Sequence, residues 1–377
     1  MFIKKLQISN FRGLGCQEVL FDKRVSIITG KNGQGKTSLI EAVYVLSQAK
    51  SFRTSKPKDM VSWNDGNSGL EAVGVIETAV GEKNIRYQLK QGKKKLLIND
   101  KTVTDAGAFF GQFQVVEFTP DDIQLISGST ALRRRFIDRL IAMTDSGFVR
   151  DSVNYHIALQ NRNALICDSV KNKKSFVSLV KGWDEQLVVY GLRISKKRQD
   201  FISRFLPFFK ESYRRICTAT EEVSIEYEGN LFSDGQMLSR DAALHKYEEY
   251  TQRDGKYQST TFGVHRDRVE IFMKCENSQT AQEARVYASQ GQRKSIALAL
   301  KLAAVEFLQS ENPDGELPVL LLDDVDSELD FVRKTALYEI ILNAKNQIFV
   351  STTEVGEWLG QLHDESRVFR VEGGSVA

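Results

Sequence analysis

The sequence predicts an α/β fold in which both ends of the chain build one domain and the middle forms an inserted, mainly helical lobe. Near the start, the apolar run VSIIT leads into a glycine-rich loop and an apolar helix. Near the end, PVLLLDDV, a helical segment and QIFVST follow in the order typical of a parallel sheet with crossover helices. Between them lie long basic segments with apolar residues at helical spacing. We therefore divide the chain into residues 1–120, 121–258 and 259–377.

Composition narrows the class of protein. The chain has 377 residues, a formal net charge of +3 and 41% hydrophobic residues, so affinity for nucleic acid would have to come from local basic patches. Its four cysteines are widely spaced, which argues against a zinc site or a disulfide framework and fits a reducing compartment. We find no signal peptide and no apolar run long enough to span a bilayer, and expect a cytoplasmic, nucleoid-associated protein with no membrane partner.

The glycine-rich loop GKNGQGKTS matches the phosphate-loop pattern GxxxxGK[ST] in full, between a strand and a helix. Its backbone N–H groups and the helix N-terminus suit phosphates, and the chain has no NKxD element for guanine, which favours ATP. A chance glycine-rich turn is the weaker alternative. We expect Lys36 to act on the β- and γ-phosphates and Thr37 to bind Mg²⁺. The predicted nucleotide-binding residues of the loop are Gly30, Lys31, Asn32, Gly33, Gln34, Gly35, Lys36, Thr37 and Ser38.

Two carboxylates follow the apolar run PVLLL. Such a run indicates a buried parallel strand, whose C-terminal end faces the ligand in an α/β sheet. We expect Asp323 to hold Mg²⁺ and Asp324 to orient or deprotonate the attacking water, which makes Asp324 and Lys36 the predicted catalytic pair. A solvated acidic turn is the alternative.

The stretch YASQGQRKS opens a long apolar helix. Taken alone, Ser289 reads as an ordinary N-cap. Taken in order, however, the phosphate loop, the long insertion, S-x-G-Q before a helix, LLLDD and SELD resemble the ABC-type ATPases. The resemblance implies an ABC-type P-loop ATPase head whose signature binds the γ-phosphate held by a second subunit. It assigns that signature to Ser289, Gly291 and Gln292, and a D-loop that crosses the dimer interface to Ser327, Glu328 and Asp330.

A narrower resemblance covers nearly the whole chain. ISNFRG, KSFRT, FTPDDIQLISGS with RRRFID, QNRNALI and GVHRD occur in the order found in the RecF family. This resemblance implies an ATP-dependent homodimer that binds DNA at gaps, a weak DNA-stimulated ATPase used as a switch, and work with RecR and RecO in loading RecA. It also implies that Arg12 and Arg53 lie close to the nucleotide.

At several positions the chain has a different residue from the one that is usual in the family. Arg293 and Lys294 shift the charge beside the signature, and Val264 and Arg268 replace the commoner residues of the GVHRD stretch. Glu354 stands where aspartate is usual. These departures bear on kinetics rather than on family membership.

Basic clusters are the candidates for DNA contact, although a charge run is more often a solvated face. Arg133 to Arg135 could either brace the lobe or touch DNA, and His265 could lie near the nucleotide or be structural. The predicted DNA-contacting residues are Lys93, Lys94, Lys95, Lys196, Lys197 and Arg198.

Two other functions remain open from the sequence. One is the ATPase subunit of another ABC-type assembly, such as a transporter. The other is an ATP-fuelled nuclease or helicase, for which no additional acidic metal cluster or helicase motif is visible.

Overall fold

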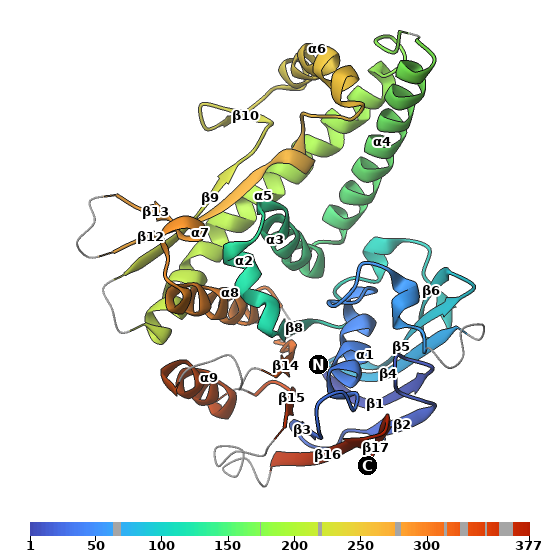
Figure 1. Cartoon of the computed structure of the whole chain (residues 1–377), viewed down its shortest axis with the longest axis vertical. Coiled ribbons are helices and arrows are strands. Elements are labelled where there is room, and N and C mark those ends of the chain that lie inside the picture. The colour runs from blue at the N-terminus through green and yellow to red at the C-terminus, as the bar shows by residue number, and fades with distance from the viewer. Residues whose placement is uncertain are drawn as a thin grey trace. The chain divides into compact units, whose positions relative to one another are not determined.

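The computed structural model describes residues 1–62, 69–173, 175–217, 221–275, 280–312, 315–324, 331–343, 345–353 and 365–377, without the side chains of residues 331, 332, 336, 340, 341 and 343. The chain divides into two compact units (Figure 1). Unit 1 comprises Met1–Ile123, Phe208–Ala219 and Ser289–Ala377, and unit 2 comprises Gln124–Pro207 and Thr220–Ala288. Within the described residues, no helix has both the length and the apolar character that crossing a membrane requires.

The first sheet of unit 1 is the predicted parallel sheet. Its strand order is β17-β16-β3-β15-β14-β8, and all pairs are parallel except β16 with β17. β15 lies between β3 and β14, so the loops that follow these strands leave the same edge of the sheet. The strands are β3 (Val25–Thr29), β8 (Val115–Phe118), β14 (Val319–Asp323), β15 (Ile348–Thr352), β16 (Ser366–Glu372) and β17 (Ser375–Val376).

The second sheet of unit 1 is antiparallel, with strand order β2-β1-β4-β5-β6-β7. Buried and exposed residues alternate along β4 and β5, as expected for strands with one covered face. The predicted turns Gln91-Gly92 and Asn99-Asp100 have positive φ at both residues, which suits tight hairpins. The strands are β1 (Phe2–Ser9), β2 (Gln17–Leu20), β4 (Leu70–Thr78), β5 (Gly81–Lys90), β6 (Lys93–Ile98) and β7 (Lys101–Thr102).

Helix α1 (Lys36–Gln48) lies between the two sheets. It packs against β8, β14 and β15 of the parallel sheet and against β4 and β5 of the antiparallel sheet. Twelve of its 13 residues are buried, which explains why its sequence is apolar on every side instead of along one stripe. At Gly74 on β4, an added Cβ would lie 2.6 Å from Leu46 Cδ1, so the glycine permits the close approach of the helix.

The rest of unit 1 includes the helix that follows the Ser-Gln-Gly-Gln loop. This helix, α8 (Gln290–Ser310), packs against β8 and against η3 (Pro120–Ile123). Its buried Lys301 donates to Glu117 O at 2.7 Å and pairs with Asp122 Oδ1 at 2.9 Å. Unit 1 further contains η1 (Pro57–Met60), η2 (Ala106–Ala108), α9 (Phe331–Asn343) and the end of α5.

Unit 2 is the helical lobe, and it extends further than the sequence suggested. β12 pairs with β9 along its whole length, so residues 259–288 belong to unit 2 rather than to the ATPase head. The helices are α2 (Gln124–Ser127), α3 (Thr130–Thr144), α4 (Ser146–Lys171), α5 (Lys181–Ile216, ending in unit 1), α6 (Arg240–Tyr257), η4 (Val264–Arg266) and α7 (Ala284–Tyr287). The strands are β9 (Glu222–Glu228), β10 (Phe232–Ser233), β11 (Gln236–Met237), β12 (Arg268–Lys274) and β13 (Gln282–Glu283).

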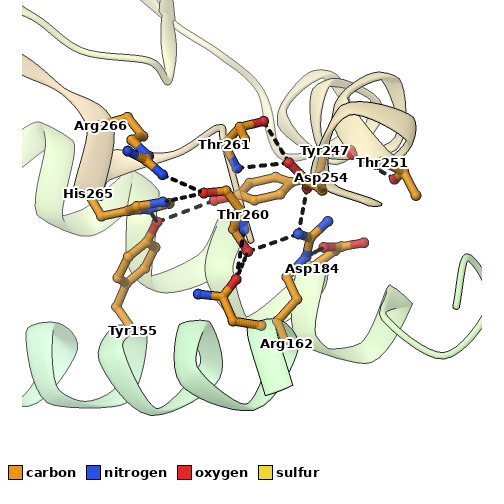
Figure 2. A network of polar contacts seen from close by, with 11 residues as sticks. Tyr155, Arg162, Asp184, Tyr247, Thr251, Asp254, Thr260, Thr261, His265 and Arg266 are labelled. Carbon is orange, nitrogen blue, oxygen red and sulfur yellow. Dashed lines mark hydrogen bonds and ion pairs between the residues drawn. The ribbon is translucent and has the colours of Figure 1, made fainter. Parts of the chain in front are cut away.

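A buried ion-pair network joins the long helices of unit 2 (Figure 2). Arg162 on α4 has no solvent exposure. Its Nε donates to Asp184 Oδ1 on α5 at 2.6 Å, and its Nη1 donates to Asp254 Oδ2 on α6 at 2.6 Å. The same guanidinium also donates to Thr260 Oγ1 at 2.9 Å. Burying these charges is tolerable only because each one has a partner, so the network fixes how three helices pack.

His265 belongs to this network as a structural histidine. Its Nδ1 lies 2.8 Å from Tyr155 Oη, and its Nε2 lies 3.0 Å from Thr260 O, so Nε2 carries the proton and Nδ1 accepts from the tyrosine (Figure 2). Burial lowers the pKa of His265 to about 4. Of the two roles left open by the sequence, these contacts favour the structural one.

We predict that His265 makes stability fall on mild acidification. Its pKa of about 4 in the folded chain lies below the ordinary value near 6.5, so the unfolded chain binds the extra proton first. As pH falls through this window, the free energy of unfolding should decrease by up to about 3 kcal/mol. Chemical denaturation at several pH values measures this, with His265→Gln expected to flatten the profile.

The matched control is His156→Gln, because His156 lies on the exposed face of α4. It should leave the pH profile of the wild type unchanged. Equal slopes in all three proteins would contradict the assignment.

Candidate functional site

The phosphate loop has the context that the sequence predicted, with β3 before it and α1 after it. Gly30, Gly33 and Gly35 have φ values of 150°, 80° and 115°, which side chains other than glycine rarely adopt. Space is also limiting, because a Cβ on Gly30 would lie 2.3 Å from Val371 O. Gly35 is the N-cap of α1. The three glycines therefore hold the loop in a conformation that other residues rarely adopt.

Lys36 is largely buried within its own loop. Its Nζ donates to Gly30 O at 2.7 Å and to Lys31 O at 3.2 Å. Gln34 accepts a hydrogen bond from Gly373 N at 2.7 Å, which ties the loop to the turn between β16 and β17. The ammonium group therefore lies inside the ring of backbone groups that a phosphate would enter.

Thr37 and Asp323 meet at the edge of the parallel sheet. Thr37 Oγ1 donates to Asp323 Oδ1 at 3.0 Å, and Ser351 Oγ at the end of β15 donates to the same oxygen at 2.7 Å. Burial raises the pKa of Asp323, whereas the hydrogen bonds from Ser351 and Thr37 oppose the rise and the charge of Asp324 adds to it. Hydroxyl and carboxylate oxygens are hard ligands of the kind that Mg²⁺ prefers. Because their hydrogen bond shows that the two groups lie close together, Thr37 and Asp323 could hold this ion jointly.

Asp324 is held in an unusual backbone conformation. Its φ is 50°, and its N–H donates to Ser351 Oγ at 2.9 Å. A non-glycine residue in the left-handed region directly after a buried strand indicates local strain, which is common at functional sites. Ser351, which the sequence did not single out, positions both acidic residues.

Glu41 is a second residue of this site, after Ser351, that sequence reasoning missed. It lies on α1 with a fully buried side chain and accepts from Arg12 Nε and Nη2, each at 2.7 Å. Arg53 Nη1 lies 3.4 Å from the same carboxylate. Glu41 thus brings together the two arginines that were predicted near the nucleotide, from loops before and after α1. The available signal was one glutamate in the otherwise apolar run LIEAVYVL.

The Ser-Gln-Gly-Gln stretch begins α8 with a capping box. Gln292 N donates to Ser289 Oγ at 3.2 Å, and Ser289 N donates to Gln292 Oε1 at 2.7 Å. Gly291 and Gln292 therefore lie within the first helical turn rather than in a loop before it. Ser289 is exposed. The expected D-loop residues Ser327, Glu328 and Asp330 lie outside the described residues, as does Glu354.

The lysines of β6 divide between the two faces of their sheet. Lys93 and Lys95 pair with Lys90 and Gln88 of β5, whereas Lys94 pairs with Leu89 on the core-facing side. Burial lowers the pKa of Lys94, and its Nζ lies 3.5 Å from Ala49 O. All three lysines remain exposed as residues, and Lys93 and Lys95 lie beside Lys90 on the face opposite the core.

The second predicted cluster is engaged inside unit 2. Arg198 is only 5% exposed and pairs with Asp138 and Asp267, with nitrogen–oxygen distances of 2.8 Å to each. Lys197 pairs with Asp145 at 2.8 Å. Lys196 is exposed and lies 3.7 Å from Asp200 Oδ2. A guanidinium enclosed by two carboxylates has no surface to offer a phosphate, so Arg198 is not retained in the DNA surface proposed below.

Arg133 and Arg134 also act inside unit 2. Arg133 Nε donates to Val269 O at 2.6 Å and its Nη2 pairs with Glu270. Arg134 donates to the backbone carbonyls of His265 and Asp267. Both arginines therefore hold β12 and the GVHRD stretch against α3.

The comparisons with known proteins agree with this geometry. The family model described as "RecF/RecN/SMC N terminal domain" matches residues 2–376. The protein called "DNA replication and repair protein RecF" of Geobacter metallireducens is 35% identical over 94% of this chain and 93% of its own length. The chain belongs to the RecF family. The protein of the same name from Geobacillus kaustophilus is 34% identical over 100% of this chain and 99% of its own length.

Solved structures support the same assignment. The structure titled "Structure of the recombination mediator protein RecF-ATP in RecFOR pathway" is 31% identical, with a TM-score of 0.86 over 100% of this chain and 98% of that one. An Smc head domain from Pyrococcus furiosus gives a TM-score of 0.54 at 16% identity, which shows the fold alone. The fold is therefore that of an SMC-like, ABC-type ATPase head with an inserted lobe.

We predict that Glu41→Gln weakens ATP binding. Without the carboxylate charge, Arg12 and Arg53 lose their common anchor beside α1, and the affinity for ATP should fall by about tenfold. Titration of the monomer with a fluorescent ATP analogue measures this. The control Glu71→Gln makes the same change beside Arg86 on the antiparallel sheet and should leave the affinity unaltered. Unchanged affinity with lowered stability would mean that Glu41 is only a structural brace.

Proposed function

We propose that this protein is an ATP-dependent DNA-binding protein of replication and recombinational repair, in which ATP drives two heads to dimerise around DNA. The observation that carries the proposal is that Lys36, Thr37 and Asp323 lie together at one edge of the parallel sheet. The same chain has a capped helix that begins at the expected signature residue Ser289. Supporting it, a full-length structural neighbour is titled as an ATP-bound recombination mediator.

The site supports hydrolysis of ATP through groups that the chain already positions. Lys36, now donating to Gly30 O and Lys31 O, would exchange these carbonyls for phosphate oxygens. Thr37 and Asp323 would hold Mg²⁺, which when bound neutralises phosphate charge. Asp324, next to Asp323 at the end of β14, would orient or deprotonate the attacking water.

The signature would complete the site of a second subunit. Ser289 Oγ accepts from Gln292 N, which leaves its own hydroxyl proton to donate to a γ-phosphate oxygen. The N-terminus of α8 adds partial positive charge. Two heads would then enclose two ATP molecules, with Ser327, Glu328 and Asp330 crossing the interface, and slow hydrolysis would open the dimer.

DNA and protein partners follow from the family. We propose sequence-independent binding of duplex DNA and of single-strand/double-strand junctions at gaps, through backbone phosphates, with the exposed face of β6 as the contact surface. RecR is the proposed direct partner, with RecO and RecA acting downstream. Support comes from the RecF–ATP structural neighbour, which is described as a recombination mediator protein in the RecFOR pathway.

We predict that ATP and Mg²⁺ convert the protein from monomer to dimer, as measured by light scattering. Asp324→Asn should trap the dimer, because ATP binds but is not cleaved. Lys36→Met and Ser289→Arg should each abolish dimerisation, the first by removing the phosphate contact and the second by blocking the signature. A wild type that stays monomeric at saturating ATP, with and without DNA, would contradict the proposal.

We predict that Lys93 and Lys95 contact DNA phosphates. The double variant Lys93→Ala/Lys95→Ala should lower the slope of log affinity against log salt by up to about two, since each phosphate contact contributes about 0.9. Binding to gapped DNA with ATP, measured over a range of salt concentrations, gives the slope. The control Lys181→Ala/Lys196→Ala removes two exposed lysines of α5. An equal loss in the control would move the contact surface to the helical lobe.

A further inference from the structure

Arg333 connects α9 to the first turn of α8. It is the third residue of α9, directly after residues 325–330, where the D-loop is expected. Its Nε donates to Ser295 Oγ at 2.8 Å, and its Nη2 donates to Gly291 O at 2.7 Å. Both acceptors belong to the turn that begins at the proposed signature. One planar guanidinium therefore holds the signature turn from the helix that follows the D-loop.

Gly291 leaves room for the guanidinium of Arg333. A Cβ added to Gly291 would lie 3.2 Å from Arg333 Nη2, which is tighter than most real Cβ contacts. A side chain at this position would require the guanidinium to shift by a few tenths of an ångström. The signature glycine thus has a function within its own subunit, in addition to the close approach of a partner's nucleotide.

The charge of Arg333 is unusual for a purely structural contact. The N-terminus of a helix carries partial positive charge, which disfavours cations and favours acidic residues. The first turn of α8 has no acidic residue and instead carries Arg293 and Lys294. Arg333 adds a guanidinium to this turn, and its hydrogen bonds to Ser295 and Gly291 fix where that group lies.

We propose that Arg333 is a positioning residue of the signature, acting from the first turn of α9. It holds the Gly291–Ser295 turn so that Ser289 is aimed at the γ-phosphate bound by the partner subunit. This inference rests on the proposed ATP-dependent dimer.

The first test separates nucleotide binding from dimerisation. Arg333→Ala should bind a fluorescent ATP analogue as a monomer with affinity within about twofold of the wild type, and should weaken ATP-dependent dimerisation by at least about tenfold, since two charge-assisted hydrogen bonds are lost. Arg333→Lys keeps the charge and should recover part of the loss. Ser295→Ala removes one acceptor and should have a smaller effect.

The control is Lys334→Ala, which makes the same change in charge at the next residue and should dimerise like the wild type. Thermal unfolding of each variant identifies a merely structural role. If Arg333→Ala lowers the melting temperature but dimerises normally well below it, the proposal is overturned. If the wild type itself does not dimerise, the proposed function fails and this inference fails with it.

A mixing experiment decides in which subunit Arg333 acts. Arg333→Ala has an intact phosphate loop and an impaired signature side, whereas Lys36→Met has the reverse. A mixed dimer therefore contains one composite site with both sides intact. Mixing the two variants should restore ATP hydrolysis above the sum of the separate proteins. No restoration, while mixing Ser289→Arg with Lys36→Met does restore activity, would place Arg333 at its own phosphate loop and overturn the inference.

Discussion

The burial of α1 between two sheets is the constraint on which the rest of unit 1 depends. The helix is apolar on all sides because the parallel and antiparallel sheets each cover one of its faces. Its position fixes the phosphate loop at its N-terminus and places Glu41 out of reach of solvent. A carboxylate in that position requires cationic partners, and Arg12 and Arg53 supply them. The packing that buries α1 therefore also positions the phosphate loop and Glu41 with its two arginines.

Strand order then brings the chemistry together. β3 and β14 are distant in sequence, and β15 pairs with both, so that Thr37, Asp323 and Ser351 meet at one edge. A second contact between segments far apart in the chain lies in the same unit, where Arg333 of α9 donates to Gly291 O in the first turn of α8.

In the helical lobe, basic residues that suggest a DNA-binding surface in the sequence are partly used in internal ion pairs. Arg162 and Arg198 are almost completely buried and are held by carboxylates from other elements. Their side chains determine how helices pack. Arg162 is held by Asp184, Asp254 and Thr260 (Figure 2), and the GVHRD stretch supplies Val264 O and Asp267 as partners of Arg198. In a lobe of this kind, a basic run in the sequence is as much a source of internal ion pairs as a surface for DNA.

The sequence by itself determined the features that depend on neighbouring residues. These include the strand, loop and helix around GKNGQGKTS, the hairpins, and the capped helix after Ser289, because glycine conformations, side-chain alternation and capping are local. Only the tertiary structure decided the role of Glu41, the pairing of Arg198, the contact of Arg333 with Gly291 and the extension of the lobe to residue 288. Each of these depends on partners far away in the chain, and a charged residue carries no local signal of the group that will neutralise it.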